Sequence, residues 1–110
     1  MAAVSNLAID QGTTFSVIFT VNDDTGTARN LTTFTARSQM RRSYYSTANT
    51  AFTVSIDNPS DGEITLNLSA NTSTSLRPGR YVYDVELISN TSTVERIVEG
   101  IVTIYPEATK

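Results

Sequence analysis

The chain has 110 residues, contains no cysteine and no histidine, and carries a formal net charge of -3 at pH 7. The missing cysteine excludes a disulfide framework and a thiolate metal site, and the missing histidine excludes Ser-His-Asp and Cys-His catalysis together with the commonest zinc sites. The length predicts one domain over residues 1–110 with short ordered tails at 1–6 and 106–110, and the negative charge argues against nucleic-acid binding, which needs a strongly basic face.

The first residues of the chain do not have the composition of a targeting segment. They lack the basic region and the apolar region of a signal peptide. Nowhere in the chain does an apolar run approach the roughly 18 residues of a membrane span. We therefore expect a soluble protein that is made in a cytoplasm and has no membrane partner.

Alternating apolar and polar residues predict two early strands, over residues 7–9 and 13–22. The following Asp-Asp-Thr-Gly run predicts a turn, because aspartate bonds its own backbone and glycine supplies a positive φ. The adjacent carboxylates of Asp23 and Asp24 also suggest a metal site, but a solvated loop tip explains them more simply. A third strand over residues 33–42 carries arginines on its polar face.

A polar loop over residues 43–50 interrupts the alternation and carries two adjacent aromatic residues. Tyrosine and arginine are among the side chains that most often anchor protein interfaces. We therefore predict a partner interface formed by Arg41, Arg42, Tyr44 and Tyr45. A mobile polar loop without a partner is the alternative that the sequence leaves open.

Two more strands, over residues 52–56 and 64–68, flank a turn and predict a hairpin. The turn faintly resembles a calcium loop, but Pro59 and Leu68 occupy positions where ligands are needed, so we expect no calcium. Residues 69–75 are small and polar and predict a bridge between two sheets, with one helical turn.

The clearest corner and the clearest strand lie side by side. Pro78 and Gly79 predict a reversal of the chain, and residues 80–88 then alternate with Tyr81 and Tyr83 on the apolar face. Immunoglobulin-like sandwiches place a tyrosine at such a corner, with its hydroxyl bonded back across it, and we assign that role to Tyr81. The alternative is that both tyrosines are large core residues with hydroxyls at the rim.

The last strand, over residues 93–105, has an ambiguous parity, since two sets of apolar residues compete for the core face. A bulge near Gly100 would let both halves face inward. Seven short strands without a helical pattern predict an all-β fold, a seven-stranded antiparallel immunoglobulin-like β-sandwich. In that order the third, sixth and seventh strands share a sheet.

This arrangement places charged side chains opposite one another on the solvent-exposed face of that sheet. By the strand alternation, Arg37 and Arg41 would lie across from Asp84 and Glu86. Glu95 and Glu99 would lie beside them on the last strand. The two carboxylates on the sixth strand can in principle serve a glycosidase, but strand alternation opposite arginines explains them without catalysis. We predict no catalytic residue, no cofactor and no metal site, and therefore not an enzyme.

Three stretches, DDTGTARNLTTFTARSQMRRSYYS, DGEITLNLSANTSTSLRPGRYVYDVEL and VERIVEGIVTIYPEAT, carry a resemblance to a known family. In this order they resemble an immunoglobulin-like β-sandwich found in virion proteins of tailed bacteriophages, including the N-terminal part of some baseplate upper proteins. The resemblance covers residues 13–109, and its best-matched pieces are 30–32, 62–68, 79–87 and 99–102. It implies a virion protein made in the bacterial host cytoplasm and present in multiple copies in a symmetric assembly.

The resemblance implies a non-enzymatic structural role, with other phage virion proteins (tail, baseplate, fibre or capsid subunits) as partners. Family members often carry a fibre or receptor-binding region after this domain, whereas this chain stops at Lys110. We therefore expect an accessory or adaptor subunit of the tail, baseplate or fibre-attachment apparatus. Two alternatives stay open: a capsid decoration protein on the phage head, and a carbohydrate-binding β-sandwich module, against which the lack of tryptophan counts.

Overall fold

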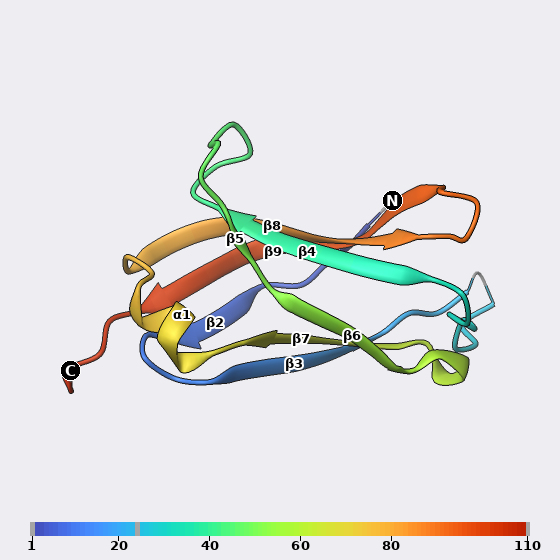
Figure 1. Ribbon diagram of the computed structural model, residues 1–110, viewed down its shortest axis with the longest axis horizontal. Helices are drawn as coiled ribbons and strands as arrows, with labels where there is room; N and C mark the ends of the chain where they lie inside the picture. The colour runs from blue at the N-terminus through green and yellow to red at the C-terminus, as the bar shows by residue number, and fades with distance from the viewer. Residues whose placement is uncertain (1, 24, 110) are drawn as a thin grey trace.

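Two β-sheets packed face to face form the body of the protein (Figure 1). The computed structural model describes residues 2–23 and 25–109. Within these residues, no helix has the length and apolar character needed to cross a membrane. The predicted all-β sandwich is confirmed.

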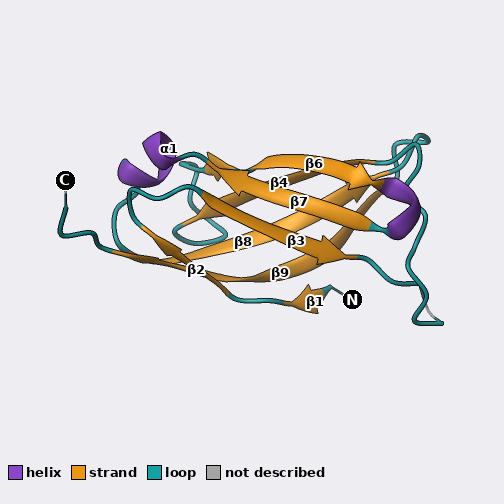
Figure 2. Cartoon of the chain, turned by 90° about the horizontal axis from the view of Figure 1, so that it is seen from below, coloured by secondary structure: helices purple, strands orange, loops and turns teal. Residues whose placement is uncertain are grey.

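The larger sheet has six strands and the smaller has three. The larger contains β1 (Ala3–Val4), β2 (Leu7–Asp10), β9 (Val94–Tyr105), β8 (Gly79–Ile88), β4 (Thr35–Arg41) and β5 (Thr50–Ala51), in the order β1-β9-β8-β4-β5 with β2 also on β9. The smaller contains β3 (Phe15–Thr20), β7 (Glu63–Leu68) and β6 (Thr53–Asn58), in the order β3-β7-β6. A short 3-10 helix η1 (Pro59–Asp61) closes the predicted β6–β7 hairpin, and α1 (Ala70–Thr74) carries the chain from the smaller sheet to the larger (Figure 2).

The third, sixth and seventh predicted strands do share a sheet, as β4, β8 and β9. The strand count differs from the prediction, because the described residues form nine strand segments instead of seven. The two additions, β1 and β5, have two residues each and are too short to show alternation. The sheet is also not purely antiparallel, since β1 and β2 both run parallel to β9.

The core lies between the sheets and follows the alternation of the strands. Four consecutive inward residues of β8 are buried, as are three of β7 (Tyr81, Tyr83, Val85, Leu87, Ile64, Leu66 and Leu68). The ring of Phe52 packs edge-on against the ring of Tyr83, with their centroids 6.2 Å apart. The Tyr83 hydroxyl donates a hydrogen bond to the carbonyl oxygen of Ser5, so the core residue also holds the N-terminal segment.

The last strand contains a bulge, but at a different residue from the predicted one. Val85 pairs with Val98 and Glu86 pairs with Arg96, so Ile97 is the extra residue. The bulge switches the parity of the strand, so that Ile97 packs against the core, and Val98, Val102 and Ile104 are buried after it. The other apolar residues of the strand, Val94, Ile101 and Tyr105, are exposed, so only part of each competing set faces inward. Gly100 has a separate role, since a Cβ there would collide with the carbonyl oxygen of Ser5. Its lack of a side chain lets the N-terminal segment lie close against β9.

Both ends of the described chain are tied to the sandwich. Ser5 N donates to Glu99 O at 2.9 Å, and the side chain of Asn6 accepts a hydrogen bond from Ile101 N at 3.0 Å. Near the C-terminus, Glu107 N donates to Gln11 Oε1 at 3.2 Å. The segment predicted as an N-terminal tail therefore includes a short strand, and it covers the outer edge of β9.

Candidate functional site

A loop over residues 42–49 connects β4 to β5 and stands away from the body of the sandwich (the green loop at the top of Figure 1). Its tip is a turn, closed by a hydrogen bond of 3.1 Å from Ser46 N to Ser43 O and supported by one of 3.2 Å from Ser43 N to Ser46 Oγ. Tyr44 and Tyr45 are the two central residues of this turn, and they are 53% and 96% exposed. We call residues 43–46 the tyrosine turn.

Arg41, the last residue of β4, supports the far side of this loop. Its Nη1 donates to the carbonyl oxygens of Ser46 and, at 3.4 Å, of Thr47. Its Nη2 donates to Gln39 Oε1 at 3.1 Å. The guanidinium therefore fixes the returning limb of the loop to the strand from which the loop leaves.

The corner before β8 contains the hydrogen bond that the sequence predicted. The Tyr81 hydroxyl donates to the carbonyl oxygen of Arg77 at 2.7 Å, across the reversal formed by Pro78 and Gly79. Gly79 has φ = +130°, which side chains other than glycine rarely adopt. The corner is thus held by a side chain on one face and by a special backbone conformation at its tip.

Arg42 joins the loop to this corner. Its Nη1 donates to Arg80 O at 3.0 Å and its Nη2 donates to Pro78 O at 3.2 Å. The guanidinium carbon lies 4.6 Å from the centroid of the Tyr81 ring, a cation–π distance. A Cβ on Gly79 would come within 2.6 Å of Arg42 Nη1, so the glycine also makes room for the arginine. We call this set of contacts the arginine clamp.

The structure divides the four predicted interface residues into two pairs. Tyr44 and Tyr45 are both exposed, as an interface anchor requires. Arg41 and Arg42 instead donate to acceptors within the chain and hold the loop in place. Nothing in the sequence identified the acceptors of Arg42, because they are backbone carbonyls 36 and 38 residues away.

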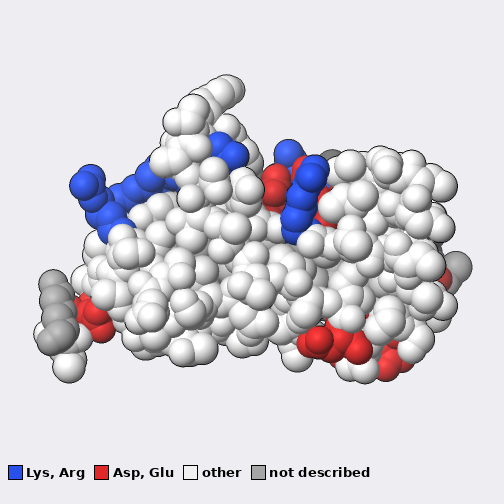
Figure 3. Space-filling view, viewed as in Figure 1, with Lys and Arg blue, Asp and Glu red and all other residues white. Residues whose placement is uncertain are grey.

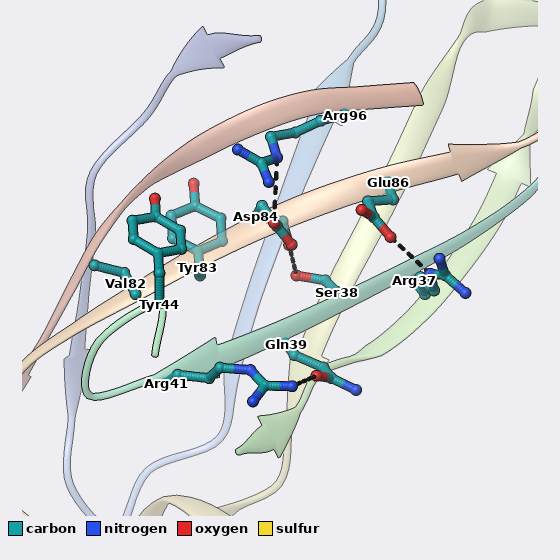
Figure 4. Close-up of a pocket in the computed structure, with 10 residues that line it drawn as sticks. All are labelled: Arg37, Ser38, Gln39, Arg41, Tyr44, Val82, Tyr83, Asp84, Glu86 and Arg96. Carbon is teal, nitrogen blue, oxygen red and sulfur yellow. Dashed lines mark hydrogen bonds and ion pairs between the residues drawn. The ribbon is translucent and has the colours of Figure 1, made fainter. Parts of the chain in front are cut away.

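Beside the loop, the outer face of β4 and β8 is hollowed over a volume of about 520 Å³ (Figure 4). Arg37 Nε lies 2.7 Å from Glu86 Oε1, as predicted, and the two residues are cross-strand partners. The prediction that Arg41 also lies across from the carboxylates of β8 is wrong, because the strand register places it opposite Val82. Asp84 instead pairs with Arg96, whose Nε lies 3.3 Å from its Oδ2. Both carboxylates of β8 are therefore in ion pairs, and Tyr44 forms one side of the hollow.

The pKa of Asp84 is raised, mainly because partial burial disfavours the charged carboxylate. Arg96 lowers this pKa, while the negative charges of Glu86 and Glu99 raise it further. Glu99 is the cross-strand partner of Asp84, so two like charges face each other on β8 and β9. Glu95 lies apart from this group and pairs with Arg29, with Nη1 3.1 Å from Oε2.

Charge is unevenly distributed over the face seen in Figure 3, where basic side chains gather along the upper part beside the projecting loop.

The predicted turn after β3 is present, and the Asp23 carboxylate accepts hydrogen bonds from Thr25 N at 2.9 Å and Thr27 N at 3.1 Å. The hydrogen bond from the Thr25 hydroxyl, followed by these two backbone hydrogen bonds, lowers the pKa of Asp23. Asp24 lies outside the described residues, and the residues that are described contain no cluster of three metal-ligating side chains.

No family model and no curated protein sequence matches this chain.

Proposed function

We propose that this chain is a non-enzymatic structural subunit of a tailed-bacteriophage particle, an accessory or adaptor subunit of the tail, baseplate or fibre-attachment apparatus. Its partners are other virion proteins, and the tyrosine turn is the surface that docks on one of them. The observation that carries the proposal is a pair of exposed tyrosines on a loop whose base is fixed by two arginines.

The arrangement of the sheets supports an immunoglobulin-like fold for this subunit. One sheet contains β4, β8 and β9, and the other contains β3, β6 and β7, which is the division expected for strands CFG and BED of that fold. The Tyr81 hydrogen bond across the corner before β8 matches the tyrosine corner of such domains. Both features support the immunoglobulin-like sandwich that the proposed role implies.

A fixed loop suits a docking role for an energetic reason. Ordering a mobile side chain at an interface costs about 0.5–1.5 kcal/mol, and a loop already held in place avoids much of that cost. Tyrosine is enriched among residues whose truncation costs about 2 kcal/mol or more of binding free energy. With 96% of Tyr45 exposed, almost its whole side chain is available for burial by a partner.

Labelled electron microscopy of intact particles tests the proposal, with the label attached beyond Lys110. We expect label at the tail or at one vertex of the particle. Label spread over the head would instead support the alternative, a capsid decoration protein that uses the same tyrosine turn. Particles without label would contradict a virion role.

The hollow beside Tyr44 favours a second candidate function, carbohydrate binding. An exposed aromatic ring next to arginines, an amide and carboxylates offers both a stacking surface and hydrogen-bond partners for a sugar. A glycan array with host polysaccharides tests it, together with a Tyr44→Ala variant. Binding that the variant loses would support this function, and silence across the array would exclude it for those glycans.

A further inference from the structure

The edge of the smaller sheet formed by β3 lacks the protection that the other edges have. The outer edge of β9 is covered by β1 and β2, which are themselves short edge strands of two and four residues. On the other side of the larger sheet, β5 pairs with Gln39 and Met40 only, and the uncovered part of β4 carries the charged Arg37. The opposite edge of the smaller sheet, β6, contains a register shift between Ser55 and Asn58, carries Asp57 and is followed directly by Pro59. Such bulges, charges and prolines discourage pairing with another chain.

By contrast, β3 reads Phe-Ser-Val-Ile-Phe-Thr, with no charge and no proline. All six of its residues pair with β7 in continuous register. A long, regular and uncharged edge is a ready template for another strand. Among the described strands, β3 is therefore the edge best suited to pairing between molecules.

The hydrogen-bonding pattern identifies which residues face the open side. Val21 N donates to Gly62 O at 2.8 Å, so the odd-numbered residues of this segment bond to the β7 side. Backbone groups alternate between the two sides of an antiparallel strand. The N–H and C=O groups of Ser16, Ile18 and Thr20 therefore point to the open edge.

Apolar surface accompanies these free backbone groups. Ile18 is 61% exposed on the outer face, directly on the edge strand. On the inner face, Phe15, Val17 and Phe19 are only half-buried, although they face the core. A second hollow, of about 780 Å³, opens beside Phe19 and Ile97, between β3 and the larger sheet.

We propose that two copies of this chain pair antiparallel through β3, with a two-fold axis at Ile18. In this register Ile18 lies opposite Ile18 of the second copy, and Ser16 lies opposite Thr20 of the second copy. Apolar residues then meet apolar residues, hydroxyls meet hydroxyls, and no charge faces a like charge. The two three-stranded sheets become one continuous sheet. This pairing goes beyond the docking role of the tyrosine turn and does not depend on it.

Single-cysteine variants test both the pairing and its register, because the chain has no cysteine of its own. In Ile18→Cys, the Cα atoms of the two copies would lie about 5.5 Å apart, within the roughly 4.4–6.8 Å range of disulfides. In Ser16→Cys, the two cysteines would lie four residues apart along the paired strands, about 13 Å, too far for a disulfide. We expect oxidation to give a covalent dimer of Ile18→Cys and monomers of Ser16→Cys and of Thr53→Cys on the other edge.

A charge substitution provides the second measurement. Ile18→Lys places two ammonium groups opposite each other and should raise the dimer Kd by about tenfold or more in sedimentation equilibrium. Thr53→Lys, a change at another exposed position, on β6, should leave the Kd unchanged, and circular dichroism verifies that each variant is folded. A native chain that stays monomeric across a dilution series would overturn the proposal. So would equal crosslinking of Ile18→Cys and Ser16→Cys, or an Ile18→Lys dimer as tight as the native one. These results come from purified protein, so they are distinguishable from failure of the virion role.

Discussion

Replacing Arg42 by alanine removes the arginine clamp, and we expect it to destabilise the domain by about 1–2 kcal/mol. The guanidinium makes two hydrogen bonds, of 3.0 Å and 3.2 Å, and a cation–π contact at 4.6 Å. Hydrogen bonds to charged groups contribute about 1.5–3 kcal/mol each, and an exposed cation–π contact about 0.5–1 kcal/mol. Arg42 is exposed, so solvent screening weakens all three contacts, and we expect their combined contribution to be only about 1–2 kcal/mol.

Urea and thermal unfolding measure this loss. A change of 1–2 kcal/mol corresponds to a fall of about 4–8 °C in Tm for a domain of this size. The matched control is Arg80→Ala, because the Arg80 side chain makes no hydrogen bond or ion pair with any described residue; it should change stability by less than about 0.5 kcal/mol. An Arg42→Ala variant as stable as the Arg80→Ala control would refute the energetic role of the clamp.

A double-mutant cycle with Gly79→Ala separates the clamp from backbone strain. A Cβ on Gly79 displaces the guanidinium, which it would approach to within 2.6 Å, and also forces alanine to φ = +130°. The strain, about 1–3 kcal/mol, remains whether or not Arg42 is present, but the displacement cost does not. We therefore expect Gly79→Ala to cost about 1 kcal/mol less in the Arg42→Ala background. Strictly additive costs would mean that the two residues do not interact.

Three further predictions concern stability. Tyr81→Phe removes the hydroxyl hydrogen bond across the corner and should cost about 1 kcal/mol in urea unfolding; an unchanged midpoint would count against the corner. The raised pKa of Asp84 means that its contribution to stability is present below its unfolded pKa and is lost as the pH rises through its folded pKa. Asp84→Asn removes that loss, so its stability relative to the native chain should rise as the pH increases from below the ordinary pKa of an aspartate through the raised pKa of Asp84, even though the Arg96 pair is broken; a falling difference would contradict the assignment. Gly100→Ala should cost about 2 kcal/mol or more, because its Cβ meets the Ser5 carbonyl, and amide hydrogen exchange should show loosening of the N-terminal segment first.

Much of the fold was predictable because alternation along a strand directly reflects which side chains face the core. The inward set of β8, the β6–β7 hairpin and the Tyr81 corner all follow from local residue patterns. The short strands β1 and β5 were not predictable, since two residues carry no period. The bulge was expected near Gly100 because glycine often marks irregular strands, but here it lies at Ile97 and the glycine makes room for another segment.

The exposed residues of the candidate site could be predicted from the sequence, but the arginine contacts that hold the loop in place could not. Adjacent tyrosines in a polar loop indicated an interface, and both side chains are exposed. The roles of Arg41 and Arg42 depend on backbone carbonyls that only the folded chain brings near, so sequence reasoning grouped them with the tyrosines. The prediction for Arg41 was also wrong because the strand register could not be read from the sequence. Arg41 pairs with Val82, and the residue that pairs with Asp84 is Gln39, two positions earlier on β4.

Incorporation of a Tyr44→Ala/Tyr45→Ala variant into phage particles tests the docking role most directly. Both side chains are exposed, so the variant should fold as stably as the native chain. The control is Tyr105→Ala, which removes another tyrosine that is 51% exposed. Quantitative mass spectrometry of purified particles measures copies per particle when variant and native chains compete. We predict at least about a 30-fold disadvantage for the double variant, equivalent to 2 kcal/mol, and none for the control. Equal incorporation of both variants would contradict the tyrosine turn as the docking surface.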